Sequence, residues 1–156
     1  MYIAPVNEIK QELKTLPPEQ VHKICLRLAK YKKENKELLS YLLFESENEH
    51  LFIESVKEEI DEQFTHLNKS SIYLAKKTLR KMLRTTRKYI RFSGSKQTEV
   101  ELLIYFCQKL KKSGLPRNSS RVIQNMYINQ VQRLKKALSA MHEDLQFDYQ
   151  DQVDKL

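Results

Sequence analysis

Glycine is scarce in this chain, and that scarcity constrains the fold more than any other feature of the sequence. Only two glycines and four prolines occur among the 156 residues. A β-sheet protein needs tight turns at short intervals, and those turns draw on glycine and proline. Lys, Leu, Glu and Gln, which favour helices, are abundant instead. The sequence therefore predicts an all-α fold.

Apolar residues recur at helical spacing in several segments, and capping residues, proline or glycine bound most of these segments. The segments cover residues 18–33, 36–46, 48–67, 69–92, 98–112 and 123–145. The first two are separated by the candidate cap Asn35, although one continuous helix through this point is also possible. Short connections between amphipathic helices predict an antiparallel helical bundle or a short stack of helical hairpins, with about five to six helices.

A chain of 156 residues has the size of one ordinary domain. We therefore expect residues 1–156 to form a single helical domain. Residues 1–17 and 146–156 are expected to be loosely packed, because chain ends fray. Cys25 and Cys107 both lie on apolar helix faces, which predicts two buried, reduced thiols.

Three sequence signals indicate where the central helices begin and end. Asn48 is the candidate cap of segment 48–67, and Gly94 is the natural left-handed terminator of segment 69–92. Thr98 and Glu101 match a capping box for the next helix. That helix is apolar nearly all round at its centre, and its boundaries favour a buried helix over a strand.

Charge is distributed very unevenly along the chain. Residues 45–66 hold one base and eight acids, whereas residues 67–96 hold ten bases and no acid. The formal net charge of +8 therefore conceals a strongly acidic segment followed by a strongly basic one. Surfaces that only need to be soluble usually mix the two signs, so a basic run without an acid indicates an anionic partner.

The basic run lies on one face of its helix. With residues about 100° apart, its bases fall within an arc of about 140°. Ile72, Leu79 and Ile90 are among the residues of the opposite arc, which would face the core. Tyr73 falls in the basic arc, where it could stack on a nucleobase or pack on its neighbours. Together these candidate residues for binding an anionic partner form the basic stripe: Lys76, Lys77, Arg80, Lys81, Arg84, Arg87, Lys88, Arg91 and Tyr73.

The preceding acidic helix is the obvious neighbour that could neutralise the basic stripe. Its wheel places Glu54, Glu58, Asp61 and Glu62 opposite its own apolar side, so we expect them to point to solvent. If both helices turn their apolar sides to one core, only flanking charges can meet. Exposed ion pairs contribute at most about 1 kcal/mol each, so pairing accounts for only part of the stripe.

We expect a non-enzymatic helical binding module. The leading prediction is a protein-interaction or assembly domain that uses the basic stripe, residues 76–91, against an acidic protein surface. The alternative is sequence-nonspecific binding of an RNA or DNA backbone by the same stripe, with affinity from counterion release. The sequence shows no helix-turn-helix, zinc-finger or RNP motif, so direct reading of bases has little support.

No set of residues points to catalysis, a metal or a cofactor. Two glycines leave no glycine-rich phosphate loop, and the four histidines are scattered. The longest fully apolar run, residues 102–107, is far shorter than the roughly 20 residues that cross a bilayer. We therefore expect no membrane insertion, a cytoplasmic location and no cofactor.

Overall fold

The computed structural model describes residues 1–118 and 120–156, and within those ranges it contains helices and no strand. The predicted all-α class is confirmed. The same ranges contain nine α-helices and one π-helical turn, which is more than the sequence predicted. The chain divides into two compact units, Met1–Phe44 and Glu45–Leu156, where the sequence suggested one domain. We call them the N-terminal and C-terminal units.

The N-terminal unit contains α1 (Val6–Thr15), α2 (Pro18–Tyr31) and α3 (Lys33–Ser40), and a π-helical turn, Tyr41–Glu45, follows α3. The helix break lies at Lys32, whose backbone is extended at φ −140° and ψ 142°. Asn35 does not cap α3, contrary to the prediction. Its side-chain amide instead donates to the carbonyl oxygen of Leu28 at 2.9 Å, which ties α3 to the last turn of α2.

Very little of the N-terminal unit is buried. Tyr41, 5% exposed, is the one buried side chain of residues 1–44, whereas Ile24 and Leu28 are exposed. Cys25 is also exposed, so the predicted burial of this thiol is wrong. The physical reason is that α2 packs mainly on the short α3, and Cys25 borders a shallow apolar hollow between these helices.

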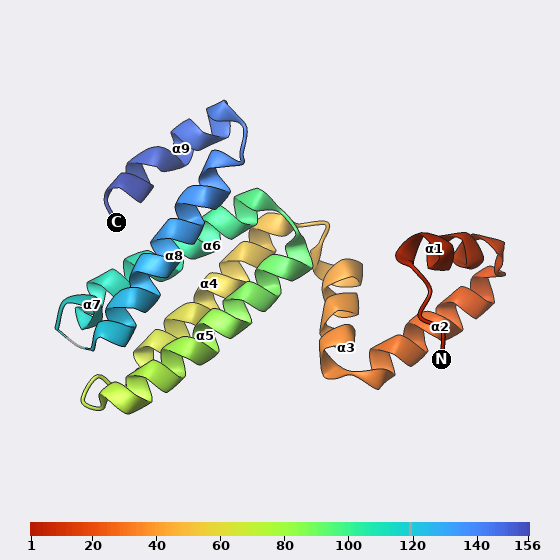
Figure 1. Ribbon diagram of the computed structural model, residues 1–156, viewed down its shortest axis with the longest axis horizontal. Helices are drawn as coiled ribbons and strands as arrows, with labels where there is room; N and C mark the ends of the chain where they lie inside the picture. The colour runs from red at the N-terminus through yellow and green to blue at the C-terminus, as the bar shows by residue number, and fades with distance from the viewer. Residues whose placement is uncertain (119) are drawn as a thin grey trace. The chain divides into compact units, whose positions relative to one another are not determined.

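The described residues of the C-terminal unit form six helices, and the four longest run alongside one another in Figure 1. Successive long helices run in opposite directions, so α5 and α8 share one direction. The helices are α4 (Glu49–Thr65), α5 (Ile72–Ser93), α6 (Lys96–Lys112), α7 (Leu115–Asn118), α8 (Arg121–Ser139) and α9 (Glu143–Asp154).

The centre of this unit is α6, which packs against α4, α5 and α8. Leu102, Leu103, Phe106 and Cys107 have no exposed surface, and burial raises the pKa of the Cys107 thiol to about 12. The prediction of a buried helix at this position is confirmed. On α5, Leu79 and Ile90 are buried as predicted, but Ile72 in its first turn is 43% exposed.

The ends of the central helices agree with some of the sequence signals and not with others. The Asn48 side chain accepts a hydrogen bond from the Leu51 amide, and Gly94 ends α5 at φ 68°, both as predicted. The predicted capping box is wrong, because α6 begins three residues earlier than Thr98 would require. The Ser95 hydroxyl caps α6 by accepting from the Thr98 amide at 3.3 Å, which leaves Thr98 buried inside the first turn.

The last predicted helix, residues 123–145, is two helices. The chain leaves α8 at Ala140 and turns through the extended His142 (φ −62°, ψ 145°) into α9. His142 caps α9, since its Nδ1 atom accepts from the Asp144 amide at 3.4 Å. Val153, 2% exposed, is the buried side chain of α9, and the Tyr127 hydroxyl on α8 donates to the Leu156 carbonyl oxygen at 2.6 Å.

We predict that truncating Phe106 is severely destabilising. The ring is fully buried and lies 5.8 Å, centroid to centroid, from the ring of Phe64. Phe106→Ala should lower the free energy of unfolding by about 3–5 kcal/mol, measured by urea denaturation. Phe147→Ala is the control: this ring is 84% exposed, and its loss should change stability by less than about 0.5 kcal/mol. Equal effects of the two substitutions would contradict the assignment of the core.

The loose packing expected for residues 146–156 remains a prediction that amide hydrogen exchange can test. Val153 is the one buried side chain of α9. The backbone amides of α9 should therefore exchange through local opening, well before those of α6. Protection of α9 equal to that of α6 would show that α9 belongs to the cooperative core.

Candidate functional site

Arginines of α5 and amides of α8 face each other across an open groove of about 610 Å³. The spacing of the arginines explains why they share one wall: positions i, i+4, i+7 and i+11 repeat on one helix face and span about 16 Å from Arg80 to Arg91. We call this site the arginine groove. It is lined by Arg80, Leu83, Arg84, Arg87 and Arg91 from α5, and by Val122, Asn125, Met126, Asn129, Gln130 and Arg133 from α8.

The structure divides the predicted basic stripe in two. Its four arginines line the groove, whereas Lys76, Lys77, Lys81, Lys88 and Tyr73 do not. Among the lysines outside the groove, Lys88 places its Nζ atom 5.0 Å from the centre of the Tyr89 ring. Tyr73 is 71% exposed in the first turn of α5. The stripe is therefore an arginine wall with a separate set of lysines beside it.

The wall formed by α8 was missed by the sequence analysis. Asn125, Asn129 and Arg133 recur every four residues, on the side of α8 that also carries Val122. This repeat is visible in the sequence, but it contains two neutral amides and one charge, so it does not stand out as α5 does. The signal that could have identified it is a second polar face on a helix whose apolar face packs on the core.

Arg87 is held in place by α8. One of its Nη atoms donates to the Oε1 atom of Gln130 at 3.3 Å, and Gln130 itself is only 2% exposed. Burial lowers the pKa of Arg87, and the charge of nearby Arg133 lowers it further. Two guanidinium groups therefore repel each other across the groove. An anion bound between them would relieve this repulsion.

Arg133 is fixed from the opposite side by α6. Its Nε atom donates to one carboxylate oxygen of Glu99 at 2.8 Å, its Nη2 atom lies 2.8 Å from the same oxygen in an ion pair, and Lys96 donates to the other oxygen at 2.9 Å. Burial opposes ionisation of Glu99, but these hydrogen bonds outweigh it, so the pKa of Glu99 lies below its ordinary value. The buried carboxylate stays ionised and sets the position of Arg133.

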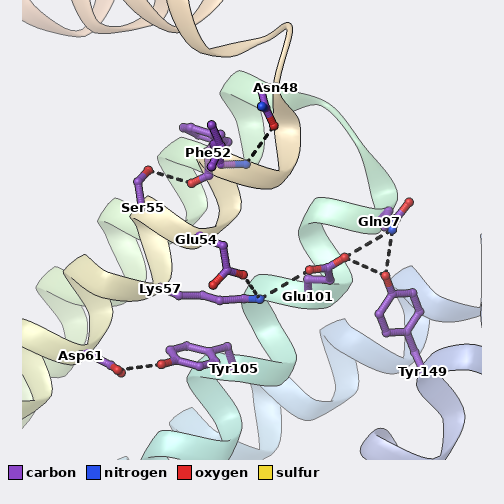
Figure 2. Close-up of polar contacts among 11 residues, drawn as sticks. Asn48, Phe52, Glu54, Ser55, Lys57, Asp61, Gln97, Glu101, Tyr105 and Tyr149 are labelled. Atoms are coloured by element: carbon purple, nitrogen blue, oxygen red, sulfur yellow. Dashed lines mark hydrogen bonds and ion pairs between the residues drawn. The ribbon is translucent and has the colours of Figure 1, made fainter.

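Two acids of α4, Glu54 and Asp61, have partners on the side of α4 that faces α6 (Figure 2). Glu54 binds Lys57 at 2.8 Å, and Lys57 also lies 3.6 Å from a carboxylate oxygen of Glu101. Asp61 accepts from the Tyr105 hydroxyl at 2.7 Å and pairs with Lys109 at 2.7 Å.

The prediction that Glu54 and Asp61 point to solvent is right only in part: their side chains are 47% and 43% exposed, but both form ion pairs, because α4 packs on α6 as well as on α5. Glu58 and Glu62 are exposed, as predicted. Within residues 1–118 and 120–156, no acid forms an ion pair with Arg80, Arg84 or Arg87. The acidic helix therefore neutralises none of these three arginines, and Arg80 and Arg84 are the two available to a partner.

Among the described residues, no group of three or more His, Cys, Asp or Glu side chains could hold a metal ion. In the same ranges, every helix is too short or too polar to cross a bilayer. No protein-family model, curated protein or solved structure significantly matches the chain.

We predict that Glu99 links the stability of the C-terminal unit to pH. Since the folded-state pKa of Glu99 lies below its ordinary value of 4.5, the ionised carboxylate stabilises the fold. That contribution is fully present above about pH 4.5 and is lost as the pH falls through the lower folded-state pKa. At pH 7, Glu99→Gln should lower the free energy of unfolding by about 1–3 kcal/mol.

The measurement is urea denaturation of both proteins between pH 7 and pH 3. The stability difference between the wild type and Glu99→Gln should shrink below pH 4.5, and a constant difference would contradict the assignment. Glu58→Gln removes the same charge from an exposed position. This control should stay within about 0.5 kcal/mol of the wild type.

Proposed function

We propose that the arginine groove binds the phosphate backbone of a nucleic acid without reading its sequence. The observation that supports this most directly is that Arg80, Arg84 and Arg87 line an open groove with no acidic partner among the described residues. A face with this charge and no neutralising neighbour is suited to an anionic partner.

The chemistry of the groove favours phosphate over other anions. A guanidinium group presents a planar fork of N–H donors that matches two phosphate oxygens, and arginine loses less hydration than lysine when it binds. The amides of Asn125 and Asn129 can add neutral hydrogen bonds to other parts of the nucleotide. Each neutralised phosphate releases counterions, so the affinity is independent of sequence and falls with salt.

An acidic protein surface fits the arginine groove less well. Protein interfaces concentrate their energy in buried aromatic or aliphatic anchors surrounded by polar residues. The apolar part of the groove lining is confined to Leu83, Val122 and Met126. We therefore rank the nucleic-acid backbone, the alternative in the sequence analysis, above an acidic protein for this site.

A protein-interaction or assembly role remains the second candidate, and a different surface favours it. The N-terminal unit exposes large apolar side chains along α2 and in the π-helical turn, including Ile24, Leu28, Tyr31 and Phe44. Contiguous exposed apolar surface is typical of protein docking. We also propose that the protein is cytoplasmic and that its helices form an antiparallel bundle.

The test is reversal of charge in the groove. The triple variant Arg80→Glu, Arg84→Glu, Arg87→Glu should no longer bind oligonucleotides of unrelated sequence. Binding is measured by fluorescence anisotropy. Wild-type affinity should fall by roughly 0.7 to 0.9 logarithmic units per tenfold increase in salt for each phosphate neutralised. Because Arg87 also holds Gln130, the double variant Arg80→Glu, Arg84→Glu should be measured as well, with circular dichroism to check the fold.

The N-terminal unit provides a matched control. Lys23, Arg27 and Lys30 have the same spacing on α2 as the three arginines have on α5, and all three are exposed. Their reversal to glutamate changes the net charge equally but leaves the groove intact. If the two triple variants lose binding equally, overall charge explains the loss. The assignment of the arginine groove as the binding site would then be wrong. Absence of salt-dependent binding in the wild type would refute the function itself.

A further inference from the structure

We infer that the groove takes a single nucleic-acid strand rather than a duplex, with the phosphates along α5 and the bases against α8. The inference rests on the proposed function and adds the form of the partner and its orientation. It follows from the difference between the two walls of the groove.

The charge of the groove is concentrated on one wall. Four arginines line the α5 side, whereas the α8 side contributes one cation, Arg133, which is ion-paired with Glu99. A duplex presents two rows of phosphates and keeps the faces of its bases stacked inside. The arginine-rich wall matches one row of phosphates, so a duplex would place its second row against a wall whose one cation already has a protein partner.

The α8 wall has the chemistry that unstacked bases need. Asn125 and Asn129 are exposed, and each amide offers both donors and an acceptor to the edge of a base. Val122, 41% exposed, and the half-buried Met126 lie beside these amides in the groove lining. Their apolar surface can cover the face of a base, which is available only when the strand is unpaired.

The register of the two helices places these groups opposite the arginines. Arg87 donates to Gln130, and α5 and α8 run in the same direction, so residues before Arg87 lie beside residues before Gln130. Arg80 and Arg84 therefore face the part of α8 that begins at Val122. Because Arg87 and Arg133 already have protein partners, this end of the groove holds the most available guanidinium groups.

The experiment compares single-stranded and duplex oligonucleotides of equal length, as DNA and as RNA, for binding to the full chain at fixed salt. The single strands, oligothymidylate and oligouridylate, should bind about tenfold more tightly than the duplexes. The double variant Asn125→Ala, Asn129→Ala should lose most of this preference and leave duplex affinity unchanged. Gln124→Ala, Gln132→Ala removes two amides of α8 outside the groove lining and should bind like the wild type.

Three outcomes would overturn the inference, and they can be distinguished. If duplexes bind as tightly as single strands, or if the asparagine variant keeps the preference, the strand assignment is wrong and the proposed function stands. If poly-glutamate binds at the same salt as tightly as the single strands, the groove is a site for acidic protein. If no oligonucleotide binds the wild type in a salt-dependent way, the proposed function fails as well.

Discussion

The burial of α6 on nearly all sides is the constraint that the rest of the C-terminal unit satisfies. Leu102, Leu103 and Phe106 have no exposed surface, so helices must cover this segment from several directions. The cover comes from α4, α5 and α8. Since α5 and α8 both turn apolar sides to α6, their polar sides meet the solvent next to each other. The arginine groove lies where those two polar sides converge.

The same central helix also fixes part of the groove chemistry. Glu99, on α6, holds Arg133, and Gln130, on α8, holds Arg87. Half of the groove is thus preorganised by the protein, while Arg80 and Arg84 keep their donors for a partner. Preorganised charges lose little side-chain entropy on binding, and the unpaired ones supply the direct contacts.

Periodicity and local caps predicted the class of the fold and much of its core. The core face of α5 was predicted from spacing alone, as Leu79 and Ile90 show, because an amphipathic wheel depends only on helix geometry. The predictions for Asn48 and Gly94 were correct for a similar reason, since each residue acts through hydrogen bonds or dihedral angles within a few residues. The predicted start of α6 was wrong because Ser95 and Thr98 are both good caps.

Only the α5 wall of the groove could be predicted from the sequence. A wheel gives the direction of each arginine relative to its own helix, but it does not identify the helix that lies alongside. The position of α8 depends on the packing of α6, and the separation of the arginines from Lys81 and Lys88 follows from that position. The engagement of Asp61 by Lys109 was missed for the same reason.

The sparse burial in the N-terminal unit has a thermodynamic consequence. The heat-capacity change of unfolding and the denaturant m-value both scale with the surface that unfolding exposes. Residues 1–44, in which Tyr41 is the one buried side chain, expose little new apolar surface when they melt. In calorimetry the full chain should therefore behave as a smaller protein than its length implies, with parameters set almost entirely by residues 45–156.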